Sequence, residues 1–128
     1  MKLNLDCVRD ILLVVEDKPS VIVYTLDEIA EKINYSKKDI EYCCYQLSMG
    51  GYLEIDQTPT PFTSSMPLIN GIGELTFQGH EFLNYIKSNT IWNKTKAKAK
   101  ELGIYSLKWM GEFAQQLAIA MIAGQIHN

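Results

Sequence analysis

Arginine is almost absent from this chain: Arg9 is the only one among 128 residues, against eleven lysines. Arginine forms the bidentate contacts with phosphates and guanine that sequence-specific DNA readers use most. Its scarcity therefore weighs against a protein whose main task is to read a DNA sequence.

Cysteine is also scarce, and its three positions are Cys7, Cys43 and Cys44. An odd number with two adjacent residues does not form a disulfide framework, so we expect reduced thiols and a cytoplasmic protein. Charged residues interrupt the first ten positions, so we expect no signal peptide. No apolar run reaches membrane-spanning length, so we expect no membrane association.

Patterns that mark catalysis or metal binding are lacking as well. The two histidines, His80 and His127, are far apart and have no cysteine or histidine at metal-ligand spacing. There is no glycine-rich phosphate loop and no evident Ser/His/Asp arrangement. We therefore expect no enzyme activity, no metal and no cofactor.

Two capped amphipathic segments, one directly after the other, are the most informative feature that is present. Thr25 and Ser36 each precede an apolar stripe and have a carboxylate three positions later, the capping-box pattern. The stripes repeat at helical spacing, through Leu26, Ile29, Ala30 and Ile33 and then through Ile40, Cys43, Cys44 and Leu47. Two short helices joined by a tight turn form a helix-turn-helix.

The flanking segments extend this motif to a winged helix-turn-helix. We predict a helix over 3–17 ended by Pro19, a minor strand over 21–24, and a glycine exit after the second stripe at Gly50-Gly51. Strands over 52–56 and 68–75 with a proline-rich loop between them form the wing, and helices follow over 77–86, 88–102 and from 106 onward. The fold class is mainly α with a small β-ribbon: a winged-helix domain (1–87) and two extra C-terminal helices (88–128).

Several strings resemble one family more closely. They are Met1–Leu12, Glu28-Ile29-Ala30, Gly79–Leu83 and Thr90-Ile91-Trp92 with Lys94-Thr95-Lys96. They resemble a family of short uncharacterised proteins from bacteria and their phages. Gly73–Leu83 is also similar to the Leu-Thr-x-x-Gly-x-x-x-Leu joint that follows the wing in bacterial winged-helix regulators. The resemblance implies a winged-helix fold in a bacterial or prophage setting, and it implies no activity.

The second helix of the pair is the candidate binding element. Its exposed side and its start present the residues Ser36, Lys37, Lys38, Tyr42, Tyr45 and Met49. Ser36 and the two lysines suit phosphates, which favours a DNA-binding regulator. Two tyrosines and a methionine suit a protein contact, which favours an adaptor of the same fold. Both alternatives stay open here.

Charge is unevenly distributed along the chain. Residues 51–86, which include the wing, hold four acidic side chains and no basic one, and residues 87–108 hold six lysines and one glutamate. DNA-contacting wings are normally basic, so a solvated loop is expected here, although Phe62 and Met66 could meet a partner. The basic patch Lys94, Lys96, Lys98 and Lys100 suits a nucleic-acid backbone or an acidic partner, or simply a docked helix with solvated lysines.

The last helix carries an apolar seam at alternating four- and three-residue steps: Met110, Ala114, Leu117 and Met121. Such a seam suits helix packing, and an apolar helix at the end of a chain must be covered by something. We predict a homodimer interface there, with packing onto the same chain as the alternative.

Overall fold

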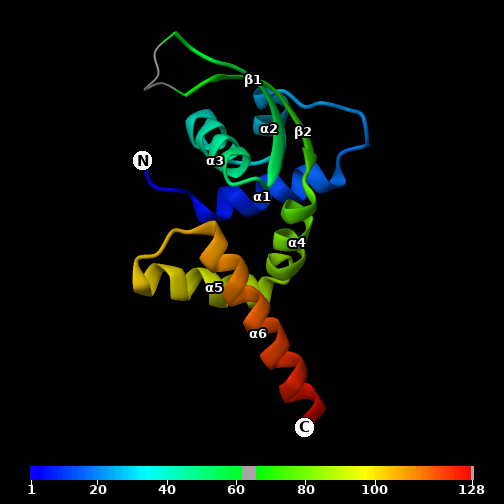
Figure 1. Cartoon of the computed structure of the whole chain (residues 1–128), viewed down its shortest axis with the longest axis vertical. Coiled ribbons are helices and arrows are strands. Elements are labelled where there is room, and N and C mark those ends of the chain that lie inside the picture. Colours follow the sequence, from blue (N-terminus) through cyan, green and yellow to red (C-terminus); the bar gives the residue numbers. More distant parts are fainter. Residues whose placement is uncertain (62–65, 128) are drawn as a thin grey trace. The chain divides into compact units, whose positions relative to one another are not determined.

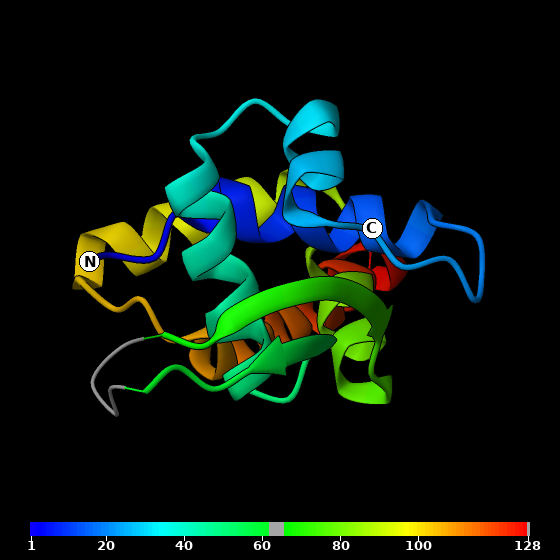
Figure 2. The same ribbon diagram turned by 90° about the horizontal axis from the view of Figure 1, so that it is seen from above.

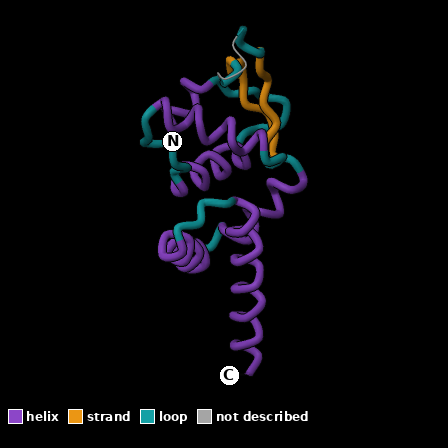
Figure 3. Tube along the Cα trace, turned by 60° about the vertical axis from the view of Figure 1, so that its left-hand side comes forward, coloured by secondary structure: helices purple, strands orange, loops and turns teal. Residues whose placement is uncertain are grey.

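The computed structural model describes residues 1–61 and 66–127, without the side chains of 125–127. In this part of the chain the protein is mainly helical with a small two-stranded antiparallel sheet (Figures 1 and 3). The elements are α1 (Leu5–Asp17), α2 (Leu26–Lys32), α3 (Lys37–Met49), β1 (Leu53–Thr58), β2 (Leu68–Leu75), α4 (Phe77–Ile86), α5 (Asn89–Leu102) and α6 (Leu107–His127).

The chain divides into two compact units, Met1–His80 and Glu81–Asn128. The first unit contains α1, α2, α3 and the β1–β2 hairpin, and the second contains most of α4 together with α5 and α6. The division falls inside α4, a few residues before the boundary that the sequence suggests at 87.

In the first unit the three helices pack on one another and on the hairpin. Helix α3 contacts α1, α2 and both strands, so it is the central element. The predicted stripe of α3 is buried: Ile40, Cys43, Cys44 and Leu47 are fully inaccessible. The side of α1 that faces the core is equally inaccessible at Cys7, Val8, Ile11 and Leu12. The cysteine edge of α3 therefore belongs to the core, as its spacing predicts.

The predicted helix starts are confirmed, but only one capping box is complete. Around α2 the Thr25 hydroxyl accepts from the amide of Glu28, and the Glu28 carboxylate accepts from the amide of Thr25, each at 3.1 Å. At α3 the Ser36 hydroxyl accepts from the amide of Asp39 at 3.1 Å. Asp39 is one methylene shorter than glutamate, which explains why no return bond to Ser36 forms.

The hairpin pairs Leu53 with Leu75 at its base and Thr58 with Leu68 at its far end. Its register shifts twice along β1, and β1 runs two residues further than predicted. The strand predicted over 21–24 is not formed. Only Tyr24 pairs with the sheet, through two hydrogen bonds with Ile72, while Val21 has a positive φ that no strand allows.

A compact joint fixes the hairpin to the helices on either side. The Thr76 hydroxyl donates to the carbonyl of Gly51 at 2.6 Å and accepts from the amide of Gly79 at 3.0 Å. The amide of Thr76 donates to the carbonyl of Tyr52 at 3.1 Å. A side chain at Gly79 would lie 2.0 Å from that carbonyl oxygen. The Thr-x-x-Gly spacing is therefore a packing requirement of this joint.

In the second unit α5 contacts α6. The inner side of α5 is formed by Trp92, Thr95 and Ala99, which are buried. Leu102 is exposed in the last turn before the chain leaves the helix at Gly103. Stacked Trp109 and Phe113 rings, with centroids 5.1 Å apart, mark the first turns of α6.

Candidate binding surface

The outer side of α3 presents side chains that differ in their exposure to solvent. Lys38 is exposed, Tyr42 and Tyr45 are half-buried, and Met49 is 67% exposed at the end of the helix. The sequence therefore placed the two tyrosines and the methionine correctly on the accessible side. Their aromatic and thioether groups are of the kind enriched in protein interfaces.

The start of α3 is already engaged within the chain. Ser36 caps the helix, and the Lys37 ammonium forms an ion pair with Asp27 on α2 at 2.7 Å. The hydrogen bond with Asp27 raises the pKa of Lys37. Two of the three residues expected to meet phosphates, Ser36 and Lys37, thus already have a partner within the chain.

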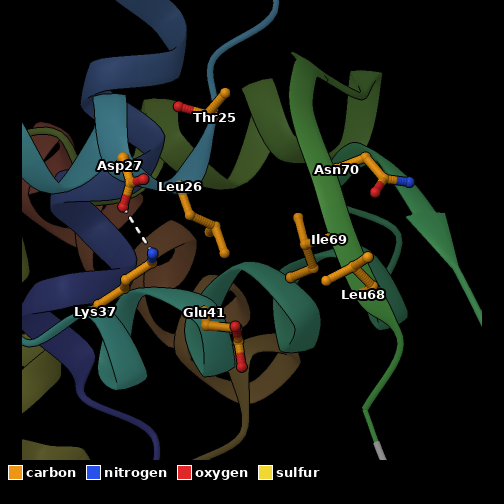
Figure 4. A pocket seen from close by; sticks show the side chains of 8 residues that line it. All are labelled: Thr25, Leu26, Asp27, Lys37, Glu41, Leu68, Ile69 and Asn70. Atoms are coloured by element: carbon orange, nitrogen blue, oxygen red, sulfur yellow. Dashed lines mark ion pairs between the residues drawn. The ribbon is translucent and has the colours of Figure 1, made fainter. Parts of the chain in front are cut away.

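A pocket of about 370 Å³ opens beside this ion pair (Figure 4). It lies between the start of α2, the start of α3 and the first residues of β2. The Asp27 and Lys37 side chains face each other across one wall, and Glu41 from α3 forms another part of the lining. The remaining lining residues are Thr25, Leu26, Leu68, Ile69 and Asn70. The sequence alone does not predict this pocket, because its three segments meet only in the folded chain.

The three thiols contribute nothing accessible to this surface. Cys7, Cys43 and Cys44 are free and fully buried. Burial raises the pKa of Cys44 to about 12, and a hydrogen bond with the Cys43 thiol, together with burial, raises the pKa of Cys7. The same hydrogen bond with Cys7 lowers the pKa of Cys43. Because none of the three thiols is accessible to solvent, their role is packing.

The hairpin presents carboxylates beside the α3 surface. Glu54 and Asp56 are exposed on β1, and Glu74 on β2 forms an ion pair with Lys18. Met66 is half-buried, and Phe62 lies outside the described residues. The hairpin therefore presents no arginine or lysine to a nucleic acid in its described part.

The candidate residues of the second unit form two groups. In the basic patch, Lys94 and Lys100 are exposed while Lys96 and Lys98 are half-buried, and Lys98 lies 3.6 Å from Glu101. Along the predicted seam of α6, Met110 and Ala114 are fully buried within the chain, whereas Leu117 and Met121 are partly accessible. The first half of the seam is therefore covered by its own chain, and Ile119 and Ile122 add exposed apolar side chains to its second half.

The described residues include no group of three or more histidine, cysteine or acidic side chains arranged to hold a metal ion. None of the helices over the same residues is long and apolar enough to cross a membrane.

Comparison with known proteins places the chain in a family. Residues 2–105 match the model of the family described as "Hypothetical protein (DUF2513)", and the chain belongs to this family. An uncharacterized protein of Haemophilus influenzae is 32% identical over 126 residues, which cover 96% of this chain and all of that protein. No solved structure matches the chain significantly.

Proposed function

We propose that the unit Met1–His80 is a winged helix-turn-helix and that it acts as a non-enzymatic adaptor of bacterial or prophage origin. In this proposal α3 is the recognition helix, and it binds a protein partner through Tyr42, Tyr45 and Met49. The observation that carries the proposal is the composition of this face: aromatic and thioether side chains beside an acidic hairpin.

Charge supports a protein partner over DNA. Residues 1–80 hold twelve acidic and six basic side chains, a net charge of −6. Phosphate contacts supply most of the affinity for DNA, so such a unit would be repelled by a duplex. The Lys37 ammonium, which we expected to meet a phosphate, is paired with Asp27 at 2.7 Å.

The pocket beside α3 gives the same surface a recess that can receive a side chain of the partner. Its lining combines apolar Leu26, Leu68 and Ile69 with the charged groups of Asp27, Lys37 and Glu41. An apolar side chain of a partner fits such a recess, while the ionic groups orient polar atoms next to it. We therefore expect the interface to extend from Met49 along α3 to this pocket.

Affinity capture from the native host with full-length bait, followed by titration of the purified partner, tests the adaptor proposal. The Tyr42→Ser/Tyr45→Ser variant is expected to bind that partner at least about tenfold more weakly, since each buried aromatic anchor is worth more than 1 kcal/mol. A matched Lys94→Ser/Lys98→Ser variant is expected to bind like the wild type. Equal affinity of the tyrosine variant would refute the role of this face.

DNA binding is the second candidate, and the observation that favours it is the exposure of Lys38, Lys94 and Lys100. Fluorescence anisotropy with a random duplex at low salt tests it. A DNA-binding protein would lose affinity with salt by roughly 0.9 log units per log unit of salt for each phosphate contact. We expect no binding at tens of micromolar, and a salt-dependent complex would replace the adaptor proposal with a regulator.

We further propose that α6 joins two copies of the chain. The accessible part of this helix, from Gln115 to Gly124, contains no charged side chain. Leu117, Ile119, Met121 and Ile122 remain at least partly accessible there. An uncharged apolar surface of this kind is complementary to a second copy of itself, which is the arrangement in symmetric dimers.

A further inference from the structure

The segment between α1 and α2 exposes three successive β-branched apolar residues. Val21, Ile22 and Val23 are 90%, 46% and 57% exposed. Figure 2 shows this segment as a loop that extends beyond the end of α1. Single exposed apolar residues are common, but three consecutive ones in a loop leave an unusual amount of apolar surface in water, even though one methyl group of Val23 lies against Gly71.

Val21 also has an unusual backbone. Its φ is +66°, and it is the only non-glycine residue with a positive φ in the described chain. A β-branched side chain in this conformation costs about 1–3 kcal/mol, and such strain concentrates at binding sites. The exposed side chain gains no packing that would offset this cost.

The loop is held in place by groups that stabilise this conformation. The Lys18 ammonium, whose side chain is fully buried, donates to the carbonyls of Ile22 and Pro19 and to the Glu74 carboxylate, the last at 2.8 Å. The amide of Val21 also donates to the Glu74 carboxylate, and these bonds lower the pKa of Glu74. The loop is therefore fixed to β2 and presents its apolar side chains in one arrangement.

The charged groups next to the loop are mostly acidic. Asp17 ends α1 immediately before it, and Glu28 follows it in the first turn of α2, both exposed, while the neighbouring Asp27 is paired with Lys37. The Lys18 charge is buried and paired with Glu74, and Lys32 lies over the Tyr24 ring at 5.2 Å. The C-terminal end of α1 adds the negative end of a helix dipole.

We propose that the Val21-Ile22-Val23 loop is a second docking surface, which inserts into an apolar pocket bordered by lysine or arginine side chains on a partner protein. The acidic surroundings select for such a border and disfavour an anionic membrane surface. Because the loop is fixed before binding, little conformational entropy is lost on docking. This surface is separate from the α3 face and does not depend on it.

Photo-cross-linking in the native cell identifies the partner to be tested. Full-length protein carries a diazirine amino acid in place of Val21, and a matched protein carries it in place of exposed Gln57 on β1. We expect one discrete adduct with another protein at position 21 that is absent at position 57. Adducts identical at both positions, or an adduct only with a second copy of this chain, would overturn the proposal.

Calorimetric titration of the purified partner then gives the decisive result. The Val21→Asn/Ile22→Asn variant keeps the loop conformation, because asparagine tolerates a positive φ, and it is expected to bind at least about tenfold more weakly. Val21→Asn alone is expected to show a smaller loss of affinity. This single variant replaces the double variant in the titration if the double variant does not fold. Wild-type affinity is expected to fall as salt is raised.

The Met49→Gln variant separates this surface from the α3 face, and it is expected to bind the cross-linked partner like the wild type. Loss of binding with Met49→Gln but not with the loop variants would assign the partner to α3 and overturn the loop proposal alone. Wild-type binding to phosphatidylglycerol–phosphatidylethanolamine vesicles that the loop variant loses would instead identify a lipid surface and equally overturn it.

Discussion

Val21 and Gly51 show how much a single residue's conformation matters here. Both have a positive φ, +66° and +83°, but only Gly51 is of the residue type that adopts it without strain. Gly51 follows α3, and its predicted role as a left-handed exit is confirmed. A Cβ at Gly51 would meet no atom within 4 Å, so its conformation alone decides the effect of a substitution.

Opposite substitutions at these two positions are expected to have opposite effects. Val21→Gly removes the backbone strain and is expected to raise the free energy of unfolding by about 1 kcal/mol. Gly51→Ala is expected to lower it by about 1 kcal/mol. Chemical denaturation followed by circular dichroism measures both. A destabilising Val21→Gly would show that the valine side chain packs more favourably than its exposure indicates.

The Lys18–Glu74 pair predicts a specific dependence of stability on pH. The bond from Lys18 lowers the pKa of Glu74 below its ordinary 4.5, so the carboxylate stabilises the fold when ionised. A lowered folded-state pKa gives a contribution that is fully present above the unfolded value and is lost as pH falls through the folded value. Glu74→Gln is therefore expected to destabilise the protein at pH 7, and this loss is expected to shrink as the pH falls below 4.5 and through the lowered pKa of Glu74.

Denaturation curves at several pH values compare Glu74→Gln with Asp56→Asn, a variant of an exposed carboxylate on the same hairpin. The control is expected to lack this pH-dependent difference. An equal loss of stability at pH 3 and pH 7 for Glu74→Gln would show that packing, not charge, is what the substitution removes.

At the scale of elements, the helices were predictable because their signals are local. A cap, a stripe and a stop lie within one segment, so α1, α2, α3 and α5 could be placed from the sequence to within two residues or so. The strand prediction for 21–24 was wrong for the opposite reason. Its β-branched residues favour a strand, but the Lys18–Glu74 pair, separated by 56 residues in sequence, fixes it as a loop. No local pattern reports such a contact.

The joint between β2 and α4 predicts a severe effect of one small substitution. Gly79→Ala would place its methyl group 2.0 Å from the Tyr52 carbonyl oxygen, which already accepts from the amide of Thr76. Because backbone must move to accommodate it, we expect a loss of about 2 kcal/mol or more in unfolding free energy. Gly124→Ala in α6, where a Cβ meets no neighbour, is expected to cause no loss. Thermal unfolding of both variants checks the pair.

For the whole molecule, the separation of charge is the feature that the sequence shows most directly. Residues 1–80 have a net charge of −6, and residues 81–128 hold six lysines and three acidic side chains, a net charge of +3. The exposed face of α3 could likewise be predicted from spacing. The pocket beside Asp27 and Lys37 could not be, since its walls come from three separate segments.

Association of two copies can be tested with the exposed second half of α6. Ile119→Glu/Ile122→Glu is expected to convert a dimer to a monomer, because two carboxylates would have to be buried in an apolar interface. Asn93→Glu/Ala97→Glu adds the same charge at exposed positions of α5, outside this surface, and is expected to leave the dimer intact. Light scattering after size exclusion measures both. A wild-type monomer at high micromolar concentration would eliminate the dimer.

The three buried thiols make the opening of the first unit measurable by thiol modification. Cys7, Cys43 and Cys44 all lie in the unit Met1–His80, and none is accessible to solvent. An aromatic disulfide reagent can modify them only when that unit opens, so the modification rate tracks its opening equilibrium under native conditions. Glu81–Asn128 contains no cysteine and stays invisible to the same reagent. Thiol modification of the unlabelled protein therefore measures the local opening of Met1–His80 separately from that of Glu81–Asn128.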